Sequence, residues 1–317
     1  MTENNNYQQL TRTFQRLSRF SHLAAIAGWD MFAMMPPGGS RARGEALAEL
    51  GVLQHQILTD KKVGEWLRHA LQEDLNDLEQ ANLREMTRQY QQAALLPESL
   101  VEAKSLAGNR CEHAWRSQRP ANDWQGFAEN LCEVVKLSRE EAQIRAEAKG
   151  CSRYDALLDI FEPDMTSARL DVLFADLKSW LPSLLANVVD KQAQKTLLEP
   201  QGPFAIADQR ELGLEAMRVL GFDFDGGRLD ISAHPFCGGV PEDVRITTRY
   251  NENDLLSALF GVIHETGHAR YEQNLPRNWV DQPVGLARST AIHESQSLFF
   301  EMQLGRSEAF LNRLLPA

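Results

Sequence analysis

The helical spacing of apolar residues, cut into segments by proline and glycine, is the feature that most restricts how this chain can fold. Between residues 2 and 26, apolar side chains recur three or four positions apart, as on one face of a helix. The sequence PPGG at 36–39 ends that helix, because proline lacks a backbone donor and glycine is conformationally free. Ser40 and Thr166 are predicted N-caps, and Pro182 is a predicted kink. Further helices are predicted over residues 40–58, 60–94, 98–117, 122–149, 166–195 and 207–220.

The pattern changes after Gly221, where apolar and polar side chains begin to alternate. Residues 229–233 and 244–250 both alternate with a period of two, and the segment CGGVPED between them is rich in turn residues. This arrangement is typical of a β-hairpin. The sequence therefore predicts a mainly α fold with a small antiparallel β-sheet, followed by a long helix capped by Asn251 or Asn253.

Composition and charge narrow the range of partners. The chain is 43% hydrophobic and 24% charged, as in an ordinary soluble protein, and its net charge of −11 matches neither nucleic acid nor an anionic membrane. Its apolar runs are shorter than the roughly 20 residues that a membrane span needs, and the polar N-terminus lacks a secretory signal core. The four cysteines are widely spaced, as expected for reduced thiols. We therefore expect a cytoplasmic protein with no nucleic-acid or membrane partner.

The stretch GVIHETGHARYE at 261–272 carries the strongest chemical signal. Residues four apart on a helix lie on the same face, so His264 and His268 can point two imidazoles at one ion. Glu265 is turned about 100° away and is free to take a proton from metal-bound water, as in the HExxH zinc motif. The alternative is a pair of histidines that are core or surface groups without a metal.

A catalytic zinc usually has three protein ligands and one open position, so a third ligand is required. The segment STAIHESQSLFFE has helical spacing and begins at a possible cap, Ser289 or Thr290. An antiparallel helix there would bring Glu294 to the two histidines, with Ser297 on the same face. His293 is the competing ligand candidate, and a surface role is the alternative for Glu294. A di-iron site would need a second ExxH sequence, which the chain lacks.

Such a centre favours peptide hydrolysis without a covalent enzyme intermediate. Zinc held by two imidazoles and a carboxylate lowers the pKa of its water towards 7 and polarises a carbonyl group. The polar side of the predicted strands offers His234, Arg245 and Thr247 as substrate-binding residues. Arg245 has an equally good structural interpretation, which is an ion pair with Asp243 or Asp230.

Several stretches taken together resemble the carboxypeptidase Taq family of zinc metallocarboxypeptidases. The matching segments are WDMFAMMPPGGSRARGE, YDALLDIFEPDMT, HPF at 234–236, DVRIT at 243–247, HETGH at 264–268 and HESQ at 293–296. The resemblance implies a mostly helical fold whose small sheet borders a groove, zinc or cobalt bound by His264, His268 and Glu294, and Glu265 as the catalytic base. It also implies a homodimer that removes single residues from the free C-terminus of peptides with broad specificity.

The chain also departs from that family. Two further family motifs, resembling IRxxAD and GxxQDxHW, are absent. Residues 1–317 are therefore expected to form the N-terminal and catalytic-core portion of a single family domain, without its C-terminal portion. Exposed apolar surface is expected where that portion would pack. The alternative functions are a catalytically silent peptide-binding or assembly module and a zinc-dependent aminopeptidase or oligopeptidase.

Overall fold

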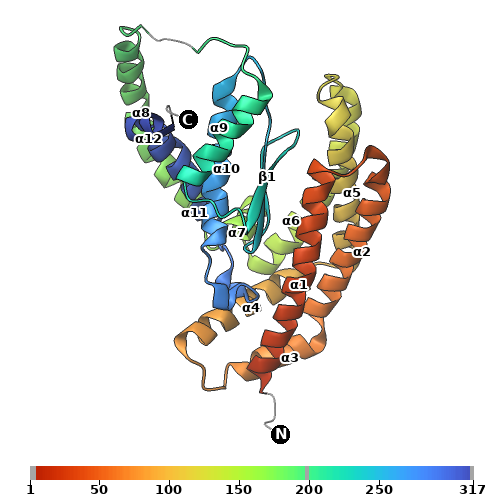
Figure 1. The fold of residues 1–317 in the computed structure, drawn as a ribbon. Coiled ribbons are helices and arrows are strands. Elements are labelled where there is room, and N and C mark those ends of the chain that lie inside the picture. Colours follow the sequence, from red (N-terminus) through yellow and green to blue (C-terminus); the bar gives the residue numbers. More distant parts are fainter. Residues whose placement is uncertain (1–4, 197–199, 315–317) are drawn as a thin grey trace.

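The computed structural model describes residues 5–196 and 200–314, and most of them lie in helices (Figure 1). The helices are α1 (Asn6–Ala33), α2 (Ser40–Thr59), α3 (Lys61–Ala70), α4 (Asp77–Ala94), α5 (Glu98–Gln118), α6 (Trp124–Lys149), α7 (Arg153–Phe161), α8 (Ser167–Gln192), α9 (Ile206–Val219), α10 (Leu255–Gln273), α11 (Thr290–Leu298) and α12 (Glu308–Leu314). Between α11 and α12 the chain continues as a π-helix, η4 (Phe299–Gly305). The mainly α fold that the sequence predicts is confirmed.

The N-terminal half is a layer of long helices. α1 packs against α2, α2 against α5, and α5 against α6. A hydrophobic core joins α1, α3 and α4, and its most deeply buried side chains include Leu10, Val63 and Met86. This layer forms a wall on which the C-terminal half rests, and α4 contacts the short turn at Pro283–Gly285 that precedes α11.

Several predicted helix boundaries needed correction. α1 continues past residue 26 to Ala33. The predicted helix over 60–94 is two helices, because the side chains of Asp60 and Asn76 each accept a backbone hydrogen bond and begin a new one. Asn76 is a residue type that can cap a helix, but helical apolar spacing on both sides of it predicted one continuous helix.

Two predicted caps have different outcomes. Thr166 caps α8 as predicted, and its hydroxyl accepts from the Arg169 amide. Ser40 is instead the first residue of α2, whose N-cap is Gly39. The sequence does not predict α7, because this helix has only nine residues and lies in a short segment between Gly150 and Pro163.

The sheet has three strands in the order β1-β3-β2, where β1 is Gly227–Ile231, β2 is Cys237–Val240 and β3 is Asp243–Thr248. β1 and β3 are parallel, and β2 is antiparallel to β3. The predicted antiparallel hairpin between residues 229–233 and 244–250 is therefore wrong, and the sheet is mixed. The segment CGGV, which has the composition of a turn, is itself the antiparallel partner of β3.

Gly239 explains why the sequence does not predict β2 as a strand. Its φ of 93° lies in the left-handed region, and a Cβ there would lie 2.0 Å from the Asp243 carbonyl oxygen. Only glycine fits this tight return of the chain. A segment poor in β-forming residues is therefore a strand because of its surroundings and not because of its own propensity.

α10 runs through the core of the C-terminal half (Figure 1). It packs against α9 and β3, so that Val262 joins the core under the sheet and Ile263 joins the core with α12. Asp254 caps the helix in place of the predicted Asn251 or Asn253. The helix that carries both histidines is therefore fixed on more than one side.

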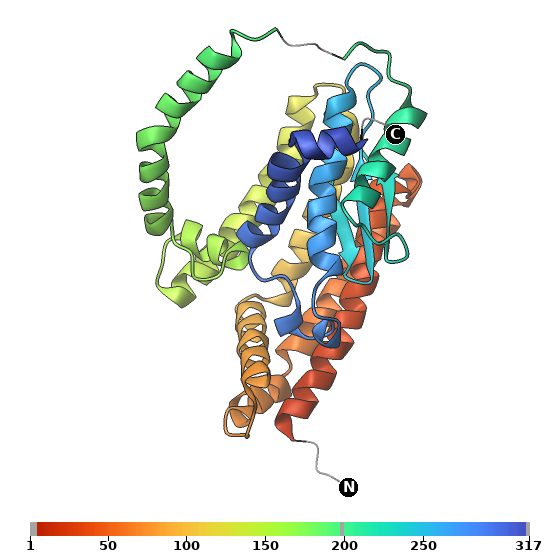
Figure 2. The same ribbon diagram turned by 60° about the vertical axis from the view of Figure 1, so that its left-hand side comes forward.

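α8 differs from every other long helix because none of its residues is buried. It stands apart from the rest of the molecule (Figure 2). Large apolar side chains cover it and are exposed: Val172, Leu173, Phe174, Leu177, Trp180, Leu181, Leu184, Leu185, Val188 and Val189. Among the described residues, it is the one helix long and apolar enough to cross a membrane by length and composition. That is weak evidence for a membrane span, since the core helix of a soluble protein can have the same composition.

The four cysteines are free thiols in the structure. Cys111 is buried, Cys237 is half-buried, and Cys132 and Cys151 are exposed. They form no disulfide, as the sequence predicts.

Candidate metal centre

His264, His268 and Glu294 converge on one point between α10 and α11. His268 Nε2 lies 3.3 Å from Glu294 Oε2, and His264 Nε2 lies 3.8 Å from Glu294 Oε1. One ligand atom from each residue lies within 4.8 Å of the other two. The structure therefore brings together the three side chains that the sequence predicts as ligands.

The spacing of these atoms fits a divalent cation. Zinc binds imidazole nitrogen and carboxylate oxygen at about 2.1 Å, and two such atoms at a tetrahedral angle lie roughly 3.4 Å apart. The observed nitrogen–oxygen separations, 3.3 and 3.8 Å, lie close to that value. Two imidazoles and one carboxylate also leave a fourth position open, as a catalytic site requires.

A close contact between backbones brings Glu294 within reach of the histidines. Gly267 faces Ser297 of α11, and a Cβ at Gly267 would lie 2.6 Å from the Ser297 Cα. Ser297 is fully buried, and its hydroxyl donates to the Glu294 carbonyl oxygen (2.7 Å). The small residues in HETGH and HESQS therefore set the distance between the two helices that carry the ligands.

The N-terminus of α11 is held by α7, the helix that was not predicted. Of the two predicted caps, Ser289 is the N-cap of α11 and Thr290 is the first helical residue, and the Ser289 hydroxyl accepts from the Ile292 amide (3.0 Å). Glu162, which ends α7, accepts hydrogen bonds from the Ser289 hydroxyl (2.7 and 2.8 Å) and from the Ala291 amide (2.9 Å). A carboxylate at a helix N-terminus is also favoured by the helix dipole. The segment YDALLDIFEPDMT therefore positions the helix that carries Glu294.

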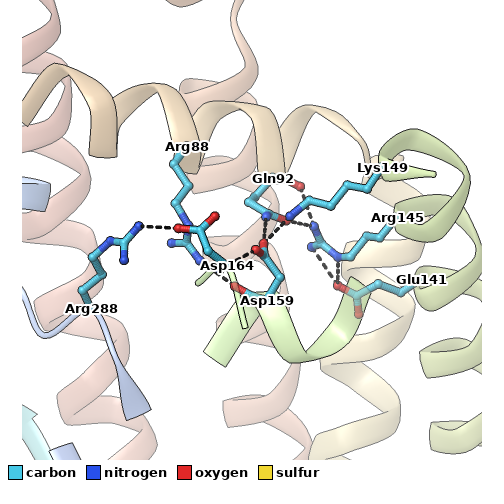
Figure 3. A network of polar contacts seen from close by, with 8 residues as sticks. All are labelled: Arg88, Gln92, Glu141, Arg145, Lys149, Asp159, Asp164 and Arg288. Carbon is cyan, nitrogen blue, oxygen red and sulfur yellow. Dashed lines mark hydrogen bonds and ion pairs between the residues drawn. The ribbon is translucent and has the colours of Figure 1, made fainter. Parts of the chain in front are cut away.

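A polar network anchors α7 in turn (Figure 3). Asp159 accepts a hydrogen bond from Gln92 of α4 (2.9 Å) and pairs with Lys149 of α6. Arg288, just before α11, extends the network to Asp164 (3.6 Å). The residues of this network that Figure 3 draws are Arg88, Gln92, Glu141, Arg145, Lys149, Asp159, Asp164 and Arg288. It ties α4, α6 and α7 to the segment that enters α11.

Glu265 lies in the same region and is 7% exposed. Burial and the negative charge of Glu294 raise the pKa of Glu265 to about 7. Burial, together with His293 and His264, lowers the pKa of His268 to about 4. A neutral histidine is the form that binds a metal, and a carboxylate that titrates near neutrality suits a general base.

The centre opens into a cavity of about 520 Å³, a volume typical of sites for small ligands. The cavity is lined by Ile160, Phe161, Phe236, Cys237, Glu265, His268, Ala287, Arg288, Ser289, Thr290, His293 and Glu294. Glu265 and two of the three proposed ligands thus share one surface with apolar side chains from α7 and from the loop before β2.

Arg245 has the structural role that the sequence offered as an alternative. It donates two hydrogen bonds to Asp243 (2.7 and 2.8 Å), which lower the pKa of that carboxyl group. Its guanidinium also lies over the Trp29 ring, 4.7 Å from the centroid. Arg245 therefore links the sheet to α1.

His234 and Thr247 are placed very differently from each other. His234 is exposed, and its Nδ1 donates to the Pro235 carbonyl oxygen (2.8 Å). Thr247 is fully buried, and its hydroxyl accepts from the Phe236 amide (3.1 Å) and hydrogen-bonds the Ser232 hydroxyl (2.7 Å). The Thr247 hydroxyl is thus enclosed, and Thr247 is not among the residues that line the cavity. It fixes the loop that carries Phe236 to the cavity.

Other acidic residues near the centre were missed in the sequence. Glu301 Oε2 lies 3.1 Å from His264 Nδ1. Glu272 Oε1 lies 2.7 Å from His293 Nε2. His293, the competing candidate for the third ligand, lies behind His268 with its Nδ1 2.7 Å from the Nδ1 of that ring, and Glu294 is the residue of α11 that faces both predicted histidine ligands. Helical spacing could have indicated both glutamates, since Glu272 follows His268 by one turn and Glu301 follows Glu294 by about two turns.

Comparison with known proteins identifies the family. The model of the Carboxypeptidase Taq (M32) metallopeptidase family matches residues 9–317. Thermostable carboxypeptidase 1 of Thermus thermophilus is 37% identical over an alignment of 329 positions, which covers 100% of this chain and 64% of that protein. Among solved structures, Trypanosoma cruzi metallocarboxypeptidase 1 is similar with a TM-score of 0.88 and 48% identity, over 98% of this chain and 63% of that one. A structure of Pyrococcus furiosus carboxypeptidase gives a TM-score of 0.86 and 28% identity, over 99% of this chain and 64% of that one.

The chain thus spans a little under two thirds of the length of these relatives. The match nevertheless includes α10 and α11, which carry the proposed metal ligands, and α7, which holds the N-terminus of α11. The chain belongs to the Carboxypeptidase Taq family of metallopeptidases.

Proposed function

We propose that this chain supplies the catalytic centre of a metal-dependent carboxypeptidase that removes single residues from the free C-terminus of peptides, with broad specificity. The observation that carries the proposal is the convergence of His264, His268 and Glu294 beside the buried Glu265. The relatives, which are named carboxypeptidases, support the choice of the C-terminal end of the substrate.

Each of these residues has a defined role in the proposed reaction. His264, His268 and Glu294 hold the metal, for which we propose zinc, with cobalt as an alternative. When bound, the cation supplies Lewis-acid polarisation of the substrate carbonyl group and makes water more acidic. Glu265 takes a proton from the water whose oxygen bonds to the carbonyl carbon. It then delivers that proton to the amine nitrogen as the carbon–nitrogen bond breaks.

We also propose that the protein is a cytoplasmic homodimer that acts on peptides and has no nucleic-acid or membrane partner. The net charge of −11 supports the exclusion of anionic partners. Residues 1–317 form the N-terminal and catalytic-core portion of one domain, which accords with the greater length of the relatives.

Peptides blocked at one end test the proposal. The zinc-loaded protein is incubated with a free peptide, with the same peptide acetylated at its N-terminus, and with the same peptide amidated at its C-terminus. The proposal expects release of the last residue from the first two substrates and none from the amidated one. Glu265→Gln should lower the rate roughly 10²- to 10⁴-fold, while Glu308→Gln, at an exposed position, should leave it unchanged.

The other outcomes correspond to the alternative functions. Cleavage of the amidated peptide but not of the acetylated one would indicate an aminopeptidase, and internal cleavage of both would indicate an oligopeptidase. A metal-loaded protein that binds the peptides and cuts none of them would indicate a silent peptide-binding module.

A further inference from the structure

The imidazole of His264 faces a carboxylate at each of its nitrogens, and both carboxylates come from one continuous stretch of chain. Its Nε2 faces Glu294 of α11, at 3.8 Å, and its Nδ1 faces Glu301 of η4, at 3.1 Å. Glu294 also faces His268, whereas Glu301 contacts His264 alone among the two histidines. The two carboxylates therefore differ in role, since only Glu294 lies where the Nε2 atoms of both rings meet.

The imidazole of His268 is held in a comparable way through a second histidine. Its Nε2 faces Glu294, and its Nδ1 lies 2.7 Å from the Nδ1 of His293. The other nitrogen of His293, Nε2, lies 2.7 Å from Glu272 Oε1. A carboxylate only accepts, so a neutral His293 carries its proton on Nε2 and offers a bare Nδ1. The proton between the two rings must then belong to Nδ1 of His268.

We propose that Glu301 and the His293–Glu272 pair are positioning residues that hold His264 and His268 as Nδ1–H tautomers, so that both rings present an Nε2 lone pair to the metal. This inference rests on the proposed function, because it assigns these residues to the same centre. A hydrogen bond to the second nitrogen of a ligating histidine fixes the orientation of the ring and makes it a stronger ligand.

Glu301 is itself anchored to the helix that it supports. Its second carboxylate oxygen accepts from Arg306 (2.8 Å), and the Arg306 guanidinium lies 4.2 Å from the centroid of Phe260. Phe260 precedes His264 by four residues on α10, one helical turn away. Two contacts thus link η4 to α10, one through His264 and one through Phe260. A π-helix widens the turn that carries Glu301, and such segments are frequent at functional sites.

The supporting side chains are shielded enough for their hydrogen bonds to matter. The side chain of Glu301 is 16% exposed, and those of His293 and Glu272 are 22% and 23% exposed. The Tyr271 ring packs edge-on against His293, 4.9 Å between centroids, and further limits its rotation. Partial exclusion of water favours a fixed tautomer over exchange between the two forms.

The tautomers are measured first in the metal-free wild-type protein, where neither metal binding nor activity is involved. Long-range ¹H–¹⁵N NMR correlations, recorded with labelled histidine at a pH well above 6.5, show which ring nitrogen carries the proton. Single His→Asn variants assign the signals. We expect Nδ1–H for His264 and His268, and Nε2–H for His293. An Nε2–H tautomer at His264 or His268 overturns the proposal.

Metal affinity is measured next, by competition between the protein and a chelator for Zn²⁺. Glu301→Gln and Glu272→Gln should each weaken binding roughly 10- to 100-fold. Glu308→Gln is the matched control, because it makes the same change at an exposed position in the same part of the chain, and it should leave the affinity unchanged. The absorption spectrum of bound Co²⁺ should shift in the first two variants and not in the control. Affinities and spectra equal to those of the wild type in both variants overturn the proposal.

These readouts separate failure of the inference from failure of the proposed function. If the wild type binds zinc and shows the expected tautomers but cuts no peptide, the inference stands and the proposed carboxypeptidase activity fails. If the wild type cuts peptides while Glu301→Gln and Glu272→Gln bind zinc as tightly as it does, the proposed function stands and the inference fails.

Discussion

α10 and α8 are both long apolar helices, yet their surroundings differ completely. α10 lies against α9, the sheet and α11, and its buried residues include Val262, Ile263 and Thr266. α8 has no buried residue and stands apart from the rest of the molecule (Figure 2). The comparison teaches that apolar spacing along a helix shows that the helix has a face to bury, but does not show which part of the chain buries it.

The chemistry of the molecule follows the same division. The described residues whose pKa values move to about 7 and about 4, Glu265 and His268, both lie on α10 where neighbouring elements exclude water. Burial makes a charge costly and thereby tunes a carboxylate or an imidazole for catalysis or for metal binding. An exposed helix such as α8 offers no comparable environment.

Truncation of a buried side chain should have the largest effect on stability. Ile263→Ala removes a side chain with 0% exposure from the core between α10 and α12, and should lower the free energy of unfolding by about 2–5 kcal/mol. Leu184→Ala on α8, where the leucine is 50% exposed, should change it by about 0.5 kcal/mol or less. Urea denaturation measures both. Equal losses would show that α8 is covered in solution and would break the comparison.

The pH dependence of stability in the metal-free protein should come next in size. Because the pKa of Glu265 is raised, its protonated form stabilises the fold below pH 4.5, and this contribution is lost as the pH rises through about 7. Because the pKa of His268 is lowered, its neutral form stabilises the fold above pH 6.5, and this contribution is lost as the pH falls through about 4. The two contributions oppose each other between pH 4.5 and 6.5.

Two substitutions separate these contributions. Relative to the wild type, Glu265→Gln should gain up to about 3 kcal/mol of stability as the pH rises from 4.5 to 7. His268→Gln should lose a similar amount, relative to the wild type, as the pH rises from 4 to 6.5. Denaturation curves recorded with a chelator at several pH values provide the test. Parallel pH profiles for the wild type and both variants would contradict the burial of these groups.

The contact between α10 and α11 should be sensitive to a single methyl group. In Gly267→Ala, the new Cβ would lie 2.6 Å from the Ser297 Cα, so α11 must shift, at a cost of about 1–3 kcal/mol and with weaker metal binding. Gly261→Ala is the matched control on the same helix, because its Cβ would come no closer than 3.9 Å to Thr248. That substitution should stabilise the helix by about 0.5–1 kcal/mol. Calorimetry measures the stability of both variants, and zinc titration measures their metal affinity. Equal stability and equal affinity in the two variants would contradict the close contact.

A charge on α8 should have the smallest effect on folding. Leu185 is 59% exposed, and Leu185→Glu should change the free energy of unfolding by about 0.5 kcal/mol or less. The same substitution should reduce association between molecules, because exposed apolar patches promote it. Light scattering measures the association. A large loss of stability in this variant would show that α8 has a partner within the same molecule.

Much of the fold was predictable from the sequence because local signals agreed with tertiary structure. The helices that carry the ligands follow from apolar spacing, and the observed cap of α11, Ser289, is one of the two that the sequence predicts. The sheet was not predictable, because β2 contains two glycines and owes its strand conformation to its neighbours. α8 shows the reverse case, since its sequence predicts a helix correctly but says nothing of its exposure.

Residues of the candidate site that lie close together in the sequence were predictable, and contacts between distant parts of the chain were not. His264, Glu265 and His268 share one helical turn, so their spacing alone indicated their relation. Glu162 holds α11 from 127 residues away in sequence, and no local spacing signals such a contact. The burial of Thr247 was not predictable either, because alternation along a strand separates two faces but does not show which face a loop later covers.

The most direct test of the metal centre is the anomalous X-ray scattering of crystals grown with zinc, recorded on both sides of the zinc absorption edge. The account predicts an anomalous peak about 2.1 Å from the Nε2 atoms of His264 and His268 and from a carboxylate oxygen of Glu294. A crystal with clear density for all three side chains and an anomalous peak only at some other site would contradict it.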